Sequence, residues 1–266
     1  MTAEAEIRFD RVTKWFPAQN DDGAPFRAVD ALSLEIARGE MVALLGKTGC
    51  GKSTTFNLIA GLLAPSEGAV RVRGLDPFQN FDDLRGKIAV VFQNDRLLPW
   101  RSAIANVELG LEMLDRPQAE RREIAQLWLA RLGLAGHESD FPHALSGGMR
   151  QRVSIARAFA TDASIMLCDE PFSSLDEITG QRLREEFTNL VRQNGKTAVF
   201  ITHHINEAMD VGDRIMVFHR PARIAYEARM DDASKGAGRQ AIQDEILKVL
   251  SLEAGEGMPA APAAVV

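Results

Sequence analysis

The sequence predicts an α/β fold with a mostly parallel β-sheet at its centre. Four short runs are almost wholly apolar, as expected of strands that helices cover on both faces; they lie at residues 41–45, 88–92, 165–168 and 197–202. Further β-rich runs bounded by turn residues lie at residues 6–9, 32–36, 69–72 and 214–218. Segments with helical periodicity fall between these runs, so strands and helices alternate along the chain.

Helical pattern without a convincing strand extends from Gln93 to Ala160. In its clearest part, residues 118–132, one face is expected to carry Ile124, Leu127, Trp128 and Leu132, with Gly133 ending the helix. We therefore predict a helical subdomain inserted into the connectivity of the sheet. After Pro221 the patterns weaken, although residues 241–250 fit one amphipathic helix, and residues 255–266, rich in Ala, Pro and Gly, are predicted to be disordered.

Composition narrows the class of protein. The chain has 266 residues, of which 45% are hydrophobic and 26% charged, enough for one sizeable domain or two intimate subdomains. Its net charge is −6 and its Lys and Arg residues are spread out, so a nucleic-acid partner is not expected. The two cysteines, Cys50 and Cys168, have no paired spacing, which indicates a reducing compartment. No signal peptide or membrane-spanning run is evident, so we expect the chain to stay in the cytoplasm.

A glycine-rich loop follows the apolar run at 41–45 and precedes a helical run at 53–63. The loop matches the pattern G-x-x-x-x-G-K-[ST] with Gly46-Lys47-Thr48-Gly49-Cys50-Gly51-Lys52-Ser53, and Thr54 follows it. Its backbone N–H groups are expected to turn toward phosphate oxygens, with Lys52 neutralising the β and γ phosphates and Ser53 ligating magnesium. A plain glycine turn between strand and helix is the alternative.

The apolar run Ile165-Met166-Leu167-Cys168 ends in two carboxylates, Asp169 and Glu170. Burying two such charges is costly unless a cation or a protic group uses them. A magnesium ion held by Asp169 and a water polarised by Glu170 would do so. By itself, a strand ending in Asp-Glu more often simply enters a loop.

A second anion site is predicted at the segment Leu145-Ser146-Gly147-Gly148-Met149-Arg150-Gln151. Ser146 is a good N-cap, Gly147 and Gly148 leave their N–H groups unshielded, and a helix over 149–160 presents its positive end. On these motifs the chain resembles the ATP-binding-cassette family from about Ile7 to Ile224. The resemblance implies a P-loop NTPase core with a mostly parallel sheet, an antiparallel β subdomain and an inserted helical subdomain that carries the signature segment. It also implies an ATPase domain at 1–230, with the helical subdomain at about 94–160, and a C-terminal extension at 231–266.

The resemblance implies the site residues as well. In this family the signature of one subunit closes over the ATP of the other, so a homodimer is expected, with the partner's ATP contacted by Ser146, Gly147, Gly148, Gln151 and Asp176. The ATP of the same subunit would be held by residues 46–54 and by Phe16, with Trp15 as its rival. Catalytic roles fall to Glu170, His203 and Gln93, and magnesium ligation to Ser53, Gln93 and Asp169. Relatives usually carry Asp where this chain has His204, which leaves open which imidazole acts.

A nucleotide site of this kind is compatible with three functions: DNA repair or translation, a small-molecule kinase, and an ATPase coupled to a permease. DNA-repair or translation members usually show coiled-coil insertions or tandem cassettes, which this chain lacks, and a small-molecule kinase would gain nothing from residues 145–151. An ATPase coupled to a permease remains. Residues 92–100, 141–145, 170–179 and 220–224 are similar to the nitrate, sulfonate and taurine importer group, although Pro221-Ala222 and Ser173-Ser174 depart from it. An exporter or an importer of another solute is the alternative.

The importer resemblance implies partners and a location. The partners would be permease subunits and an extracytoplasmic solute-binding protein, and the chain would lie peripherally on the cytoplasmic face of the inner membrane. The loop after Gln93 has a related interpretation. Its apolar residues Leu97, Leu98 and Trp100 form either a groove for a permease helix or a seal between subdomains.

Overall fold

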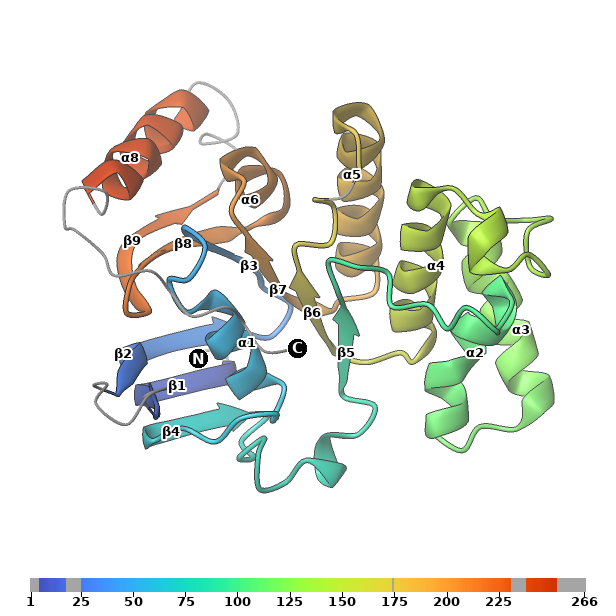
Figure 1. The fold of residues 1–266 in the computed structure, drawn as a ribbon, viewed down its shortest axis with the longest axis horizontal. Coiled ribbons are helices and arrows are strands. Elements are labelled where there is room, and N and C mark those ends of the chain that lie inside the picture. Colours follow the sequence, from blue (N-terminus) through green and yellow to red (C-terminus); the bar gives the residue numbers. More distant parts are fainter. Residues whose placement is uncertain (1–4, 18–24, 174, 231–237, 253–266) are drawn as a thin grey trace. The chain divides into compact units, whose positions relative to one another are not determined.

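The computed structural model describes residues 5–17, 25–173, 175–230 and 238–252 (Figure 1). The chain forms two compact units, one made of residues 1–79 and 201–266 and the other of residues 80–200. Within the described ranges, no helix is long and apolar enough to cross a membrane.

The first unit contains an antiparallel sheet in the order β2-β1-β4. Its strands are β1 (Ala5–Phe16), β2 (Phe26–Ala37) and β4 (Glu67–Val72). Ile7 lies opposite Ile36 on one side and Val72 on the other, and all three side chains are fully buried. This sheet confirms the antiparallel β subdomain that the family resemblance implied.

The first unit also holds the strand that leads into the glycine-rich loop. That strand, β3 (Met41–Leu45), is fully buried and runs parallel to β8 (Arg214–His219), which pairs in turn with the antiparallel strand β9 (Arg223–Arg229). Sequence patterns missed β9 because most of its side chains are exposed or half-buried, so it carries no apolar run. The helices of this unit are α1 (Lys52–Ile59), α6 (Ile205–Val211) and α8 (Gly238–Leu252).

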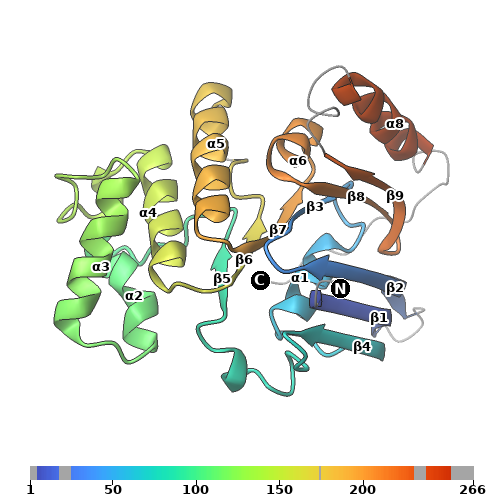
Figure 2. The same ribbon diagram turned by 180° about the vertical axis from the view of Figure 1, so that it is seen from behind.

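Helix α8 packs against β8 and β9, as Figures 1 and 2 show. Its Ile246 is fully buried, Val249 O lies 3.0 Å from His219 Nε2, and Arg239 pairs with Asp210 of α6 at 2.8 Å. The helix expected at 241–250 is therefore confirmed and longer than predicted. The disorder expected for residues 255–266 concerns residues outside the described ranges.

Among its described residues, the second unit has strands in the order β5-β6-β7 and four α-helices. The strands are β5 (Ile88–Val91), β6 (Ile165–Asp169) and β7 (Thr197–Thr202), whose last two residues already belong to the first unit. The helices are α2 (Ala103–Met113), α3 (Gln118–Arg131), α4 (Gly147–Ala160) and α5 (Glu177–Gln193). Aromatic contacts in the core involve Trp128, Phe159, Phe172, Phe187 and Phe200.

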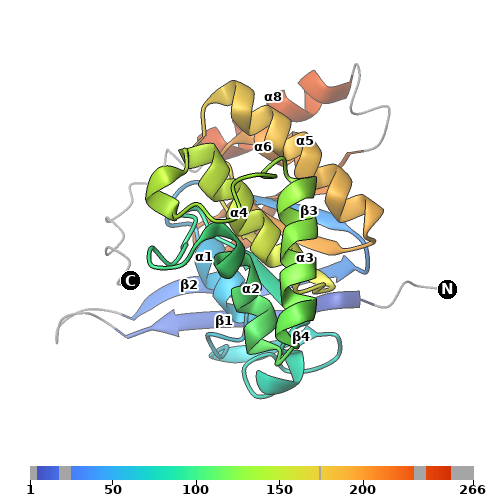
Figure 3. The same cartoon turned by 90° about the vertical axis from the view of Figure 1, so that its right-hand side faces the viewer.

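Helices α2, α3 and α4 pack on one another (Figure 3). The expected buried face of α3 was partly wrong. Residues 125, 128, 129 and 132 are buried, whereas Ile124 is half-buried and Leu127 is 48% exposed. Small Ala125 had no weight in the apolar pattern, yet it is fully buried.

Candidate functional site

The glycine-rich loop is shaped by two glycines that no other residue could replace without a shift. A Cβ at Gly51 would lie 2.4 Å from Ala28 O and 2.6 Å from the Ala222 Cβ, and the φ of Gly51 is 103°. A Cβ at Gly46 would lie 2.7 Å from Phe218 O. The loop backbone is thus pressed against β2, β8 and the turn after β8, in a conformation that needs glycine. This geometry fits the phosphate loop that the sequence predicts.

Lys52 is bent back into the loop that it follows. Its side chain is buried, and its Nζ donates hydrogen bonds to Gly46 O at 2.6 Å and Lys47 O at 2.9 Å. The ammonium group therefore sits inside the ring of loop backbone, where an oxyanion would attract it. Ser53, the next residue, is exposed at the start of α1, so its hydroxyl is available to a ligand.

Trp15 and Phe16 lie at the end of β1, and both are half-buried. Successive side chains of a strand point to opposite faces, so only one of the two can face a nucleotide. The Arg27 guanidinium lies 4.1 Å from the centroid of the Trp15 ring, whereas the Lys14 ammonium lies 5.5 Å from that of Phe16. The Trp15 ring is thus already stacked within the protein, which favours Phe16 for the base.

In the second unit, Gln93, Asp169 and Glu170 lie at one edge of the sheet. Strands β5 and β6 run parallel with Val91 opposite Cys168, so the residues that follow both strands emerge together. Gln93 is exposed, and both carboxylates are half-buried. Burial, with a smaller contribution from the Asp169 charge, raises the pKa of the Cys168 thiol well above its usual range, so this cysteine stays protonated.

Glu170 has an unusual backbone conformation. Its φ is 45°, in the left-handed region that glutamate rarely adopts. Its carbonyl oxygen accepts hydrogen bonds from the Ser173 amide at 3.2 Å and from the Ser173 hydroxyl at 3.0 Å. Strain of this kind costs of order 1–3 kcal/mol and persists where the surrounding structure imposes it. The turn after β6 therefore holds the backbone of Glu170 in a conformation that costs some stability. Backbone strain of this kind is typical of a functional residue.

The signature segment has the local structure that its sequence predicts. Ser146 is the N-cap of α4, and its Oγ accepts a hydrogen bond from the Met149 amide at 3.3 Å. A Cβ at Gly147 would come no nearer than 3.9 Å to Arg150, and one at Gly148 no nearer than 3.4 Å to Thr179. Neither glycine has a positive φ. Packing thus does not require glycine at either position. What the two glycines provide is backbone N–H groups without side-chain cover at the N-terminus of a helix.

Gln151 and Asp176, both predicted to contact the partner's ATP, form hydrogen bonds within the second unit. Gln151 is only 2% exposed, and its Nε2 donates to Pro171 O at 2.6 Å and to Phe92 O at 3.4 Å. That burial does not fit a side-chain contact with a partner's ATP. Asp176 is exposed and caps α5 by accepting a hydrogen bond from the Thr179 amide at 3.0 Å, which lowers the pKa of its carboxyl.

His203 and His204 follow β7, in the first unit. Both are exposed, and their ring centroids lie 4.0 Å apart. Beneath them, the Thr202 hydroxyl donates to the buried Glu207 carboxylate at 2.6 Å and accepts from the His204 amide at 3.0 Å. The turn is thus held firmly, and either imidazole lies within reach of the same small ligand.

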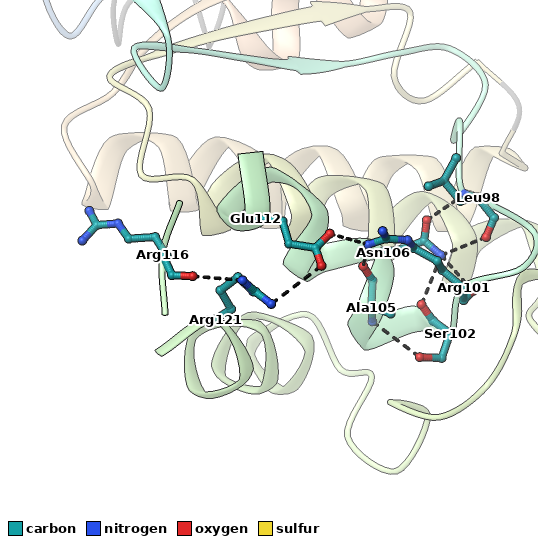
Figure 4. Close-up of polar contacts among 8 residues, drawn as sticks. All are labelled: Leu98, Arg101, Ser102, Ala105, Asn106, Glu112, Arg116 and Arg121. Carbon is teal, nitrogen blue, oxygen red and sulfur yellow. Dashed lines mark hydrogen bonds and ion pairs between the residues drawn. The ribbon is translucent and has the colours of Figure 1, made fainter. Parts of the chain in front are cut away.

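The part of the β5–α2 loop nearest α2 is held by the buried side chain of Asn106, as Figure 4 shows. Asn106 is fully buried, accepts a hydrogen bond from the Leu98 amide, and donates to the carbonyls of Leu98, Arg101 and Ser102 at 2.9–3.2 Å. Leu97 is buried, whereas Trp100 is 71% exposed. Leu97 therefore seals the core, and the loop displays Trp100 on a rigid base.

Several side chains that tie these segments together could not be identified from the sequence. Asp95, Asn106 and Arg157 had no motif of their own, because their partners are backbone atoms or residues distant in the chain. Asn106, a polar residue among the apolar positions of α2, was the one signal available. A polar residue on a buried helical face requires partners, and here the partners are the loop.

Comparison with known proteins places these features in one family. The family model described as ABC transporter matches residues 29–173. An uncharacterised ABC transporter ATP-binding protein of Methanocaldococcus jannaschii is 39% identical over 86% of this chain and 83% of its own length. The taurine import ATP-binding protein TauB of Yersinia pestis is 44% identical over 71% of this chain and 73% of its own. TauB of Rhizobium johnstonii is 42% identical over 85% and 84%.

Solved structures agree. A dimeric ATP-binding cassette in a post-hydrolysis state, bound to ADP and phosphate, has 34% identity and a TM-score of 0.74 over 85% of this chain and 99% of its own. A dimeric bacterial ABC transporter cassette has 35% identity and a TM-score of 0.75 over the same shares. The chain, with its glycine-rich loop, its strand ending at Asp169 just before Glu170 and its helix capped by Ser146, belongs to the ABC transporter family and is an ATP-binding and ATP-hydrolysing subunit of it.

Proposed function

We propose that this chain energises an importer for a small anionic or sulfur- or nitrogen-containing solute of the nitrate, alkanesulfonate or taurine type. Two copies would bind beneath permease subunits on the cytoplasmic face of the membrane, with an extracytoplasmic binding protein delivering the solute. The observation that carries the proposal is the 42–44% identity to taurine import ATP-binding proteins over most of the chain. An exporter, or an importer of another solute, is the competing function.

An uptake experiment tests this proposal. The gene is deleted in its own organism, and uptake of labelled taurine, an alkanesulfonate and nitrate is measured with the wild-type gene or the Glu170→Gln gene restored. We expect uptake of one of these solutes to fall on deletion and to return only with the wild-type gene. Unchanged uptake of all three, or accumulation of a solute after deletion, would refute the substrate class or the direction.

The roles of individual residues are part of the proposal. In each subunit Lys52 and the loop at 46–54 hold the phosphates, and Phe16 stacks on adenine. Glu170 accepts a proton from the attacking water, while His203 and Gln93 orient the γ phosphate and that water. Ser146, Gly147 and Gly148 of the partner complete the phosphate site, together with the partner's Asp176. The chemistry is mostly positioning and charge neutralisation, which suits the rigid loop backbones described above.

Magnesium is the metal that this donor set fits. Ser53, Gln93 and Asp169 offer a hydroxyl, an amide carbonyl and a carboxylate, which are the hard oxygen ligands that the ion prefers. Among the described residues no group of three His, Cys, Asp or Glu side chains could hold a metal by itself. In this proposal the ion would be bound largely through nucleotide phosphates and water, where it would neutralise charge on the phosphates.

The signature glycines provide a test of the dimer that separates function from folding. Because a Cβ at Gly147 meets nothing closer than 3.9 Å, Gly147→Ala should change the free energy of unfolding by less than about 1 kcal/mol. The added methyl would, however, cover N–H groups that the partner's ATP needs, so we expect ATP turnover to fall about tenfold or more. Steady-state hydrolysis and thermal melting measure the two effects. Normal turnover in a folded Gly147→Ala protein would remove this segment from the nucleotide site.

The exposed Trp100 leads to a prediction about the permease. Trp100→Ala should leave the stability and the basal ATP turnover of the isolated chain unchanged within about twofold, because the ring is 71% exposed. If Trp100 is an anchor for a permease segment, affinity for detergent-solubilised permease should fall about tenfold or more. Leu127→Ala, at a 48% exposed position on α3, is the matched control. Equal affinities for the two variants would exclude Trp100 from the permease interface.

A further inference from the structure

The segment after Gln93 is tied to the signature helix by an ion pair within the second unit. Arg150 Nε donates to Asp95 Oδ2 at 2.9 Å, across 55 positions of the chain. Arg150 also donates through Nη1 to Leu145 O at 2.9 Å. One guanidinium therefore joins the loop that begins at Gln93 to the residue that precedes the N-cap Ser146.

Two further side chains of α4 hold the same loop. Arg157, two turns beyond Arg150, donates to the carbonyl oxygens of Asp95 at 2.7 Å and Arg96 at 2.8 Å. Gln151 reaches the carbonyls of Phe92 and Pro171. The loop is thus attached to the helix at both ends of the stretch 92–96, and Asp95 itself is braced because its Oδ1 accepts from the Leu97 amide at 3.1 Å. A shift of either segment must move the other.

We propose that Asp95 and Arg150 are positioning residues that couple the two nucleotide sites of the dimer. This inference rests on the proposed function, in which Gln93 contacts the ATP of its own subunit and Ser146, Gly147 and Gly148 contact the ATP of the partner. The Asp95–Arg150 pair makes the contact with the partner's ATP depend on the contact of Gln93 with the ATP of its own subunit. ATP bound in one subunit fixes the loop at 93–96, and the pair carries that position to the N–H groups that meet the partner's ATP.

The placement of the pair agrees with a positioning role. The side chains of Arg150 and Asp95 are 37% and 28% exposed, so their attraction is partly screened and contributes little to stability. Arg157, in contrast, is more deeply enclosed, and burial lowers the pKa of its guanidinium although the Asp95 charge opposes this effect. Arg157 anchors the loop to the helix, and the Asp95–Arg150 pair sets its register.

A charge-exchange experiment tests the proposal. In the Glu170→Gln background, the protein concentration for half-maximal dimerisation with ATP is measured by analytical ultracentrifugation for Asp95→Arg, Arg150→Asp and the double exchange. The affinity for a fluorescent ATP analogue is measured at concentrations where the chain is monomeric. We expect each single variant to keep its ATP affinity within about twofold and to need about tenfold more protein to dimerise. The double exchange should recover most of that loss.

Controls separate a positioning role from general damage. Arg116→Glu reverses one charge of the exposed pair between Arg116, which precedes α3, and Glu120 in its first turn, and should leave dimerisation unchanged. Arg150→Lys, which keeps the charge but loses the second hydrogen bond, should be intermediate. Melting temperatures should shift by no more than about 4 °C.

The contrary outcomes are distinct. Normal dimerisation of both folded single variants, or a double exchange no better than the singles, would overturn the coupling role. Failure of the Glu170→Gln parent to dimerise with ATP would instead refute the proposed dimeric function, and the coupling inference with it.

Discussion

Glu170→Gln is expected to lower ATP turnover by a factor of about 100 to 10,000, while ATP binding is kept. The amide cannot accept a proton from the attacking water, yet it has nearly the shape of the carboxylate. The backbone turn at φ 45° keeps the two hydrogen bonds that Ser173 donates to the Glu170 carbonyl, because the substitution leaves that carbonyl in place. With ATP and without turnover, the variant should accumulate as a stable dimer.

Steady-state phosphate release and analytical ultracentrifugation measure the two parts of this prediction. Glu177→Gln is the matched control, since it makes the same chemical change seven residues away, at a side chain that is 83% exposed. We expect that control to hydrolyse ATP normally. A near-normal rate in Glu170→Gln would remove Glu170 from its role as the general base.

Lys52→Ala is expected to have the second large effect, a loss of ATP affinity of about 10- to 100-fold together with loss of hydrolysis. Two losses combine in this variant. The positive charge that faces the phosphates disappears, and so do the bonds from Lys52 Nζ to Gly46 O and Lys47 O that hold the loop closed. The loop should therefore bind less tightly and also be less ordered before ATP arrives.

Titration with a fluorescent ATP analogue measures the loss of affinity. Lys248→Ala, at a lysine of α8 with a 67% exposed side chain, removes the same charge from the chain and should bind the analogue normally. If Lys52→Ala bound ATP with the wild-type affinity, the loop at 46–53 would be a structural turn and not a phosphate site.

The sequence alone determined the local chemistry. The apolar strand before Asp169 and the N-cap Ser146 act through neighbours a few positions away, so short patterns predict their backbone correctly. The buried strands were predicted for the same reason. The glycine-rich loop was predicted from its own spacing, although the close contacts that require Gly46 and Gly51 come from residues 28, 218 and 222. The family and the ATPase activity, which depend on these motifs, are confirmed by the comparisons. The limits of the helical subdomain at about 94–160 stay a prediction.

The tertiary structure decided everything that depends on partners distant in the chain. It showed that Gln151 is buried, and that the buried face of α3 includes Ala125 and leaves Leu127 exposed. It also showed that most side chains of β9 are exposed or half-buried. It also paired Asp95 with Arg150, although 55 positions separate them. No local pattern encodes such contacts, because a charge or an amide has no periodicity and its partner is chosen by the packing of helices and strands. The sequence thus predicted two phosphate-binding segments, and the packing specified how the segment at 145–151 is tied to the loop that begins at Gln93.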